Sequence, residues 1–166
     1  MKVFIIAAQT IDGFIARKSD ENSLSWTSKS DKKHFISKTK EAGVCIMGRN
    51  TFNTINKALP GRRTIVMSRS EDIKILGVET TKETPKELLT RLESEGVKEV
   101  AITGGSSIYT SFIKESLVDK IYLTIEGQIF GDGIKLFNEP HDQNLKLVSS
   151  TKIGENTVLL EYDINK

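Results

Sequence analysis

The feature that most constrains the fold is a series of short apolar runs separated by segments with helical periodicity. The first run, "KVFIIAA", is apolar at successive positions, so a strand formed from it would bury both of its faces. Further runs of this kind are "GVCIMG", "RTIVMSR", "VKEVAIT" and "KIYLTIE", with helical segments between most of them. This alternation predicts an α/β domain built on a mainly parallel sheet with flanking helices.

Capping signals place the helices. Thr84, Pro85 and Glu87 form a capping box with proline at the first helical position, so a helix is predicted over "PKELLTRLESEG". Ser28 caps a predicted helix that runs to about Ala42. Shorter helices are expected at "RNTFNTI" and "SSIYTSFIKESL", and "LKLVSSTKI" and "TVLLEYDI" flank "GEN" as a C-terminal antiparallel hairpin. We therefore expect a single domain over residues 1–166.

Charge and cysteine content narrow the functional classes. The formal net charge is only +2 and the lysines are spread along the chain, so no basic stripe for a nucleic-acid partner is present. Cys45 lies inside an apolar run and has no second cysteine, which favours a buried thiol in a reducing compartment. No segment is suited to a signal peptide or a membrane span, and a cytoplasmic protein is expected.

Ligands of α/β sheets bind beyond the carboxyl ends of the strands, so the strand-to-helix turns are the places to search. The turn "ITGGSSIY" places two glycines before a helix, where the backbone could approach a phosphate closely. A tight turn that needs glycine for its shape explains the pair equally well, because the spacing is not that of the dinucleotide fingerprint.

Two arginines follow successive predicted strands. In "MGRNTF", Gly48 and Arg49 precede Thr51, and "MSR" ends with Ser68 and Arg69. Arg49 alone would be assigned to the solvated surface. Together the two guanidinium groups suit a dianionic phosphate better than a hydroxyl pair, which favours a phosphorylated dinucleotide.

The segment "WTSKSD" holds the only tryptophan, Trp26, and an acid, Asp31. On the predicted helix, Asp31 shares a face with Phe35, Thr39 and Ala42, so its carboxylate would point inward. Asp31 also occupies the third helical position, where the acid of a capping box would lie. From spacing alone, the capping role is the stronger interpretation.

Taken in order, the segments resemble the dihydrofolate reductase family along nearly the whole chain. The resemblance is carried by "IAAQTIDGFIA", the spacing from Trp26 to Asp31 and Phe35, "IMGRNTF", "LPGRRTIVMSR", "ITGGSSIY" followed by Phe112, and "IYLT" followed by "GD". It implies an eight-stranded sheet, NADPH as the reductant, dihydrofolate as the small-molecule substrate, no metal and a monomer. It also reverses the interpretation of Asp31.

The resemblance implies a substrate site around Asp31. Asp31 would accept hydrogen bonds from the pterin ring with support from Thr124, while Trp26 closes the pocket behind a lid loop. Arg62, in "LPGR", would bind the α-carboxylate of the glutamate tail. The remaining residues expected to contact the substrate are Ala7, Ala8, Leu24, Phe35, Ile55, Leu59, Thr103 and Tyr109.

The cofactor site implied by the resemblance combines the glycine pair with both arginines. Arg49, Thr51, Ser68 and Arg69 would hold the adenosine end and its phosphates. The other residues expected to bind NADPH are Ala8, Ile15, Gly48, Asn50, Thr103, Gly104, Gly105, Ser106, Ser107, Ile108 and Tyr109. Hydride would pass from the nicotinamide C4 to C6 of dihydrofolate, and a water entering past Leu24 would protonate N5.

Some positions depart from the family's usual pattern. They are Ser25 where proline usually precedes the tryptophan, a longer lid "ARKSDENSLS", Thr103 in place of an aliphatic residue, and Ala16 in place of a frequent glycine. Moreover, "DGFIA" and "GDGIKLF" resemble the reductase domain of riboflavin biosynthesis, which reduces a phosphorylated aminouracil ribose with NADPH. That family lacks the Trp-to-Asp spacing and the "LPGR" arginine. A nucleotide-binding module without catalysis is the third hypothesis.

Overall fold

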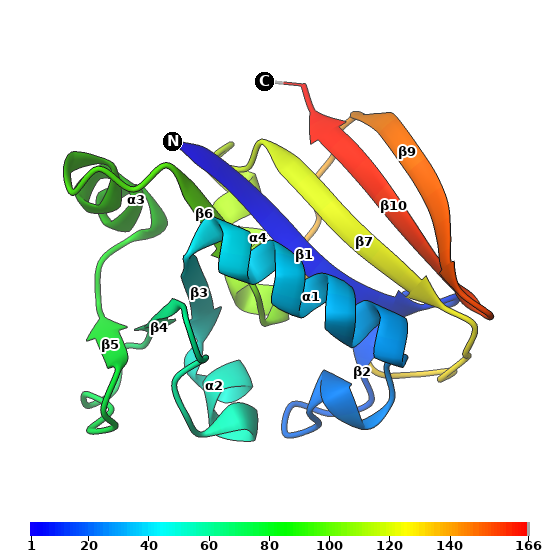
Figure 1. Ribbon diagram of the computed structural model, residues 1–166, viewed down its shortest axis with the longest axis horizontal. Helices are drawn as coiled ribbons and strands as arrows, with labels where there is room; N and C mark the ends of the chain where they lie inside the picture. The colour runs from blue at the N-terminus through cyan, green and yellow to red at the C-terminus, as the bar shows by residue number, and fades with distance from the viewer. Residues whose placement is uncertain (166) are drawn as a thin grey trace.

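Strand β1 (Lys2–Thr10) lies in the interior of an eight-stranded sheet, between β6 (Glu99–Ile102) and β7 (Lys120–Glu126) (Figure 1). The structure is a computed structural model that describes residues 1–165. Residues 3–7 of β1 are all buried, and they alternate between two hydrophobic clusters on opposite faces of the sheet. The predicted strand with two apolar faces is confirmed, because both β1 faces are covered.

The other elements follow the predicted alternation. The helices are α1 (Lys29–Ala42), α2 (Arg49–Ile55), α3 (Pro85–Ser94) and α4 (Ser106–Lys114), with one 3-10 turn, η1 (Ser23–Ser25). The remaining strands are β2 (Phe14–Ala16), β3 (Val44–Gly48), β4 (Arg63–Met67), β5 (Val78–Thr81), β8 (Ile134–Lys135), β9 (Leu145–Gly154) and β10 (Thr157–Ile164).

The strand order is β5-β4-β3-β6-β1-β7-β10-β9. Pairings from β5 through β7 are parallel, whereas β10 is antiparallel to both β7 and β9. The predicted parallel sheet that ends in an antiparallel hairpin is therefore confirmed.

Helices cover both faces of the sheet (Figure 1). On one face, Phe35 and Ala42 of α1 pack against Phe4 and Tyr122 of the sheet. On the other face, the cluster that includes Val3, Ile5 and Ala7 also contains three leucines of α3 and three apolar residues of α4. The thiol of Cys45 is buried as expected, and this burial raises its pKa to about 11.

Two features were not predicted from the sequence. Strand β5 reads "VETT" and is only partly buried, so it lacks the apolar run that marks the other strands. Strands β2 and β8 form a separate two-stranded sheet, next to Gly133. A Cβ atom at Gly133 would lie 2.3 Å from the carbonyl oxygen of Ala16, so this close approach requires glycine.

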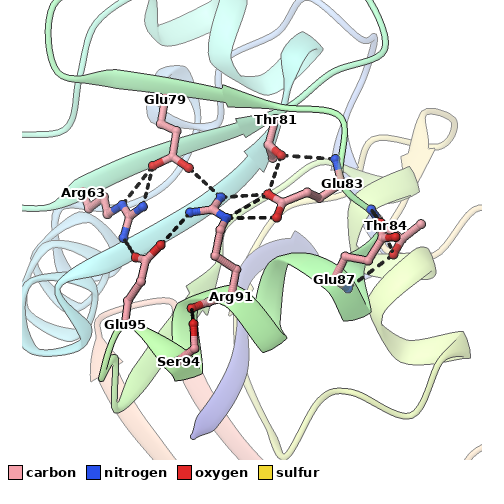
Figure 2. A network of polar contacts seen from close by, with 9 residues as sticks. All are labelled: Arg63, Glu79, Thr81, Glu83, Thr84, Glu87, Arg91, Ser94 and Glu95. Atoms are coloured by element: carbon pink, nitrogen blue, oxygen red, sulfur yellow. Dashed lines mark hydrogen bonds and ion pairs between the residues drawn. The ribbon is translucent and has the colours of Figure 1, made fainter.

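An ionic network fastens α3 to the edge of the sheet (Figure 2). Arg63 donates to Glu79 at 2.7 Å and to Glu95 at 2.5 Å. Arg91 donates to Glu79 at 2.6 Å, to Glu83 at 2.7 Å and to Glu95 at 3.0 Å. Since Arg63 belongs to β4, Glu79 to β5 and Arg91 to α3, the network joins three elements.

Candidate active site

Helix α1 begins at the segment that holds Trp26 and Asp31. Ser28 has an extended backbone and its hydroxyl accepts a hydrogen bond from the backbone N–H of Asp31 at 3.2 Å. Ser28 is therefore the N-cap, as predicted, and Asp31 is the third residue of the helix.

The Asp31 carboxyl does not complete a capping box. The backbone N–H of Ser28, which the acid of such a box would bind, donates instead to Oε1 of Glu126 at 2.8 Å. Glu126 is the last residue of β7 and is only 3% exposed. Its other carboxyl oxygen, Oε2, accepts from the Thr157 hydroxyl at 2.9 Å. The capping interpretation of Asp31 is thus wrong as far as its side chain is concerned.

Asp31 lies in a partly buried environment with few positive charges. Burial raises the pKa of its carboxyl above the usual value, and the negative charge of Glu126 acts in the same direction. The hydroxyls of Thr124 and Thr27 and the charge of Lys32 partly offset these effects. A partly buried carboxyl of this kind, which lies near hydroxyl groups and does not cap its helix, is characteristic of functional sites.

Trp26 is 8% exposed and is held by residues that follow β7. Its carbonyl oxygen accepts from Nε2 of Gln128 at 2.8 Å, and its ring meets that of Phe130 at a centroid distance of 5.0 Å. The guanidinium of Arg17 lies 3.9 Å from the Phe130 centroid, which connects the predicted lid to this stack. Within residues 1–165, the buried indole N–H has no hydrogen-bond partner.

The two central strands bring further predicted residues to the same place. Ala8 of β1 is the register partner of Thr124 of β7, which is 1% exposed. Tyr109 of α4 donates its hydroxyl to the carbonyl oxygen of Ile6 at 2.9 Å. Burial, followed by the negative charge of Asp31, raises the pKa of Tyr109. Asp31, Thr124 and Tyr109 therefore belong to one electrostatic neighbourhood.

The predicted tail site lies at the loop before β4. Arg62 donates from Nη1 to the Thr39 hydroxyl of α1 at 2.8 Å and from Nε to the Pro60 carbonyl at 3.0 Å. Leu59 packs against the same cluster as Phe35, and it also contacts the cluster around Phe52 to which Ile55 belongs. These two hydrogen bonds orient the Arg62 side chain, and neither was predicted from the sequence.

A second group of residues gathers at the carboxyl ends of β3, β4 and β6. Gly48 donates its N–H to the carbonyl oxygen of Gly104 at 2.8 Å. Gly104 has a φ of 136°, and a Cβ atom there would lie 3.0 Å from the hydroxyl of Thr51. The peptide bond between Gly104 and Gly105 is cis. Ser106, which begins α4, has a buried hydroxyl with no partner among the described residues.

The predicted arginine pair is only partly ordered by protein contacts. Arg49 donates from Nε to the Ser68 hydroxyl at 2.7 Å, and from Nη2 to the carbonyl oxygen of Glu71. Arg69 is exposed. The Thr103 hydroxyl donates to the carbonyl oxygen of Ile46 at 3.2 Å. The other predicted residues range from half-buried Ala8, Ile15 and Ile108 to exposed Leu24, Asn50 and Ser107.

The sequence interpretation missed Glu126 and Gln128. Glu126 ends the mostly apolar strand "KIYLTIE", and this position was the only signal that a buried acid could lie beside α1.

Two surface hollows lie away from Asp31. One runs along the outer side of α1 from Lys29 to Ser37, and the other lies beside Gln9 and Tyr162; Asp31 lines neither. Among residues 1–165, no helix is long and apolar enough to cross a bilayer.

Comparison with known proteins shows the family of the chain. The family described as dihydrofolate reductase matches residues 2–164. The type 3 dihydrofolate reductase of Salmonella typhimurium is 33% identical over 133 residues, covering 80% of this chain and 76% of the relative. The dihydrofolate reductase of Bacillus subtilis is 33% identical over 131 residues, covering 78% of this chain and 73% of the relative.

This chain shares its fold with solved structures of two kinds, a riboflavin biosynthesis protein and a dihydrofolate reductase. A riboflavin biosynthesis protein from a Shewanella species, described as putative in that structure, superposes with a TM-score of 0.86 at 21% identity over 100% of both chains. The dihydrofolate reductase of Enterococcus faecalis, complexed with NADP(H), superposes with a TM-score of 0.78 at 24% identity, covering 99% of this chain and 97% of the other. Since the family match spans almost all of the described residues and the sequence relatives agree with it, the chain belongs to the dihydrofolate reductase family of oxidoreductases.

Proposed function

We propose that this protein reduces 7,8-dihydrofolate to 5,6,7,8-tetrahydrofolate with NADPH. The observation that carries the proposal is the state of Asp31. Its carboxyl is partly buried, lies near the Thr124 hydroxyl and is not used to cap α1. A carboxyl in this position can accept two hydrogen bonds from the amidine edge of a pterin ring.

The residues beyond β3, β4 and β6 fit a phosphorylated dinucleotide. A Cβ atom at Gly104 would make a tight contact of 3.0 Å with the Thr51 hydroxyl, and the φ of 136° there strains any other residue, so glycine leaves the backbone open. The buried Ser106 hydroxyl has no protein partner among the described residues and can donate to a phosphate oxygen. Arg49, already oriented by Ser68, would contact the adenosine phosphate together with Arg69.

In the proposed mechanism, Arg49, Arg69 and the glycine pair would hold NADPH, which when bound would supply the hydride for C6 of dihydrofolate. The protein's own residues supply alignment and one negative charge. Asp31 would hold the pterin ring and favour its protonated form, because a negative charge stabilises a developing positive charge nearby. Trp26 and Phe35 would exclude water from the ring, and Arg62 would bind the glutamate carboxylate. A water entering past Leu24, which is exposed, would protonate N5.

The test is a direct assay of the purified chain. NADPH is mixed with dihydrofolate, and the loss of its near-ultraviolet absorbance is followed over time. A parallel assay contains NADH in place of NADPH, and Arg49→Ala is tested with both cofactors. Turnover with dihydrofolate, and an Arg49→Ala loss much larger for NADPH than for NADH, are the expected results. Equal losses for both cofactors would remove the phosphate assignment.

A second candidate is reduction of a phosphorylated aminouracil ribose. The similarity in fold to the Shewanella protein favours it, whereas the Trp26 to Asp31 spacing and Arg62 favour dihydrofolate. Turnover of the aminouracil compound without turnover of dihydrofolate would establish the second candidate. Tight NADPH binding without turnover of either compound would indicate a nucleotide-binding module.

A further inference from the structure

We propose that Glu126 is a positioning residue, which closes the N-terminal cap of α1 in place of Asp31 and thereby keeps the Asp31 carboxyl available to the substrate. This inference rests on the proposed function, because it concerns the group that would bind the pterin ring. Nothing in the local sequence around Asp31 indicates it.

Helix α3 shows what the local motif does when no distant acid accepts the hydrogen bond of the N-cap N–H. The N–H of Thr84 donates to Oε2 of Glu87 at 2.8 Å, and the N–H of Glu87 donates to the Thr84 hydroxyl at 3.3 Å. Both halves of the capping box come from residues three positions apart (Figure 2). Asp31 stands at the matching position of α1, so the same contact with Ser28 is within its local reach.

In α1 that contact is already occupied. The N–H of Ser28 donates to Glu126 Oε1 at 2.8 Å, and a single N–H makes one hydrogen bond of good geometry. Only the half of the box that involves the Ser28 hydroxyl and the Asp31 N–H remains local. The Asp31 carboxyl therefore does not bind the Ser28 N–H, although its position in the helix would allow that contact.

Glu126 is held firmly enough to perform this role. It ends β7, is 3% exposed, and its second carboxyl oxygen accepts from Thr157, its register partner on β10. The following Gln128 binds the carbonyl oxygen of Trp26 at 2.8 Å. The end of β7 thus fixes the chain on both sides of Thr27, immediately before α1. A buried negative charge at this helix start is also favoured by the helix dipole.

Glu126 influences Asp31 electrostatically as well as sterically. The charged groups that shift the pKa of Asp31 are Glu126 from β7 and Lys32 from α1 itself, and the charge of Asp31 in turn raises the pKa of Tyr109 on α4. After burial, the charge of Glu126 is the main cause that raises the pKa of Asp31. Removing that charge should therefore lower the pKa of Asp31, whether or not the hydrogen bond to Ser28 is retained.

Two substitutions separate the hydrogen bond from the charge. Glu126→Gln keeps a carbonyl acceptor for the Ser28 N–H and removes the charge. Glu126→Leu removes both, so the Ser28 N–H becomes available to Asp31. Glu87→Leu is the matched control, since it opens the capping box of α3 at a distance from the proposed site.

The measurements are kcat/KM for dihydrofolate across pH, thermal unfolding, and the pKa of Asp31 from a carboxyl NMR titration. Glu126→Leu should lower kcat/KM by about tenfold to a hundredfold, because a small displacement of a group that aligns substrate has effects of that size. Its crystal structure should place the Asp31 carboxyl within hydrogen-bond distance of the Ser28 N–H. Glu126→Gln should keep most of the activity while the pKa of Asp31 falls. Glu87→Leu should lower the melting temperature and leave kcat/KM unchanged.

A double-mutant cycle tests whether Glu126 acts through Asp31. In an Asp31→Asn background, Glu126→Leu should have little further effect on kcat/KM, because the group it positions is already absent. The proposal is overturned if the full loss persists in that background. It is also overturned if the folded Gln and Leu variants lose equal activity, since the loss would then follow the charge alone.

Failure of the proposed function would look different. In that case the unmodified protein would not turn over dihydrofolate, whereas the NMR titration and the variant structure would still report where Asp31 lies. If Asp31 stays away from the Ser28 N–H in folded Glu126→Leu, the positioning role is wrong regardless of the substrate.

Discussion

Helices α1 and α3 begin with the same local pattern, a hydroxyl residue followed three positions later by an acid, but the side chains of the two acids make different contacts. At α3, Glu87 is exposed and closes the capping box with Thr84. At α1, Asp31 is partly buried and its side chain leaves the Ser28 N–H to Glu126. The difference teaches that a capping motif specifies where a helix starts, whereas its surroundings decide what the acid does.

The acids at α1 and at α3 differ in which positively charged and polar groups surround them. Around α3, Arg63 and Arg91 pair with three glutamates at the edge of the sheet (Figure 2). Around the start of α1, Lys32 is the cation among residues 1–165 that acts on Asp31, and hydroxyl groups supply the other favourable contacts. The α3 region therefore pairs its acids with arginines, whereas the α1 region surrounds Asp31 mainly with hydroxyl groups, as the proposed ligand site would require.

The largest expected effect comes from Asp31→Asn. This change keeps the shape of the side chain but places a donor where the proposed pterin contact needs an acceptor. Breaking such a pair costs about 2–5 kcal/mol, so kcat/KM for dihydrofolate at neutral pH should fall by about tenfold to several thousandfold. Activity should partly recover at acid pH, where the substrate is protonated in solution. Steady-state NADPH oxidation over roughly pH 5 to 9 measures both effects.

The same variant should be slightly more stable than the unmodified protein at neutral pH. The folded state raises the pKa of Asp31, so its ionised form costs stability above that folded pKa, and the cost disappears as the pH falls through it. Thermal unfolding of both proteins checks this sign. A well-folded variant with near-normal activity would show that the Asp31 carboxyl has no part in turnover, and it would remove the functional contrast between the two helices.

Arg62 and Arg63 are adjacent in the chain, but Arg62 belongs to the proposed substrate site and Arg63 to the ionic network at α3. Substituting each arginine in turn therefore compares the two regions directly. Arg62→Ala should raise the KM for dihydrofolate about tenfold through the loss of a bidentate contact with the glutamate carboxylate. A pterin without the glutamate tail should be reduced equally well by both proteins. Arg63→Ala should lower stability and leave the KM unchanged. A raised KM in the Arg63 variant alone would show that the two arginines have been assigned to the wrong regions.

Arg91→Ala tests the α3 region by itself. It removes the central donor of the network, and about 1–2 kcal/mol of unfolding free energy should be lost because the pairs are partly exposed. Turnover of dihydrofolate should not change. Chemical denaturation gives the stability, and raising the salt concentration should reduce the difference between variant and parent. A loss of activity without a loss of stability would contradict the division between the regions.

The smallest expected effect concerns His34, on the sheet-facing side of α1. Burial, followed by the charge of Lys38, lowers the pKa of this imidazole, whose ring centroid lies 5.7 Å from that of Tyr122. The folded state therefore prefers neutral His34, and stability should fall as the pH drops below the imidazole's ordinary value. His34→Phe should reduce this dependence between about pH 7 and pH 5 without changing activity. An unchanged slope would assign the dependence to other groups.

Much of the fold could be predicted from the sequence because its signals are local. The apolar run of β1, the capping box at Thr84 and the cap at Ser28 each depend on neighbouring residues, and all three were confirmed. Strand β5 was missed because a partly buried edge strand needs no apolar run. Strands β2 and β8 were missed because three and two residues are too few to produce a recognisable period.

The site was predicted less completely. The glycine pair and Arg49 could be located because strand ends are the expected ligand sites of α/β sheets. The contact between Arg62 and Thr39 could not be foreseen, because they are 23 positions apart and both β3 and α2 lie between them in the chain. Whether the predicted residues bind NADPH and dihydrofolate remains a prediction that the assays above can test.

The sequence by itself determined where the four helices and the longer strands of this protein lie, since hydrophobic period and capping chemistry act over a few residues. Only the tertiary structure decided which acid caps α1. Ser28 and Glu126 are 98 positions apart, and they meet because the parallel pairing of β1 with β7 and the antiparallel return of β10 bring the end of β7 beneath the start of the helix. A hydrogen bond depends on distance in space, so no local pattern could distinguish the Asp31 carboxyl, which lies near the Thr124 and Thr27 hydroxyls, from the Glu87 carboxyl, which caps α3.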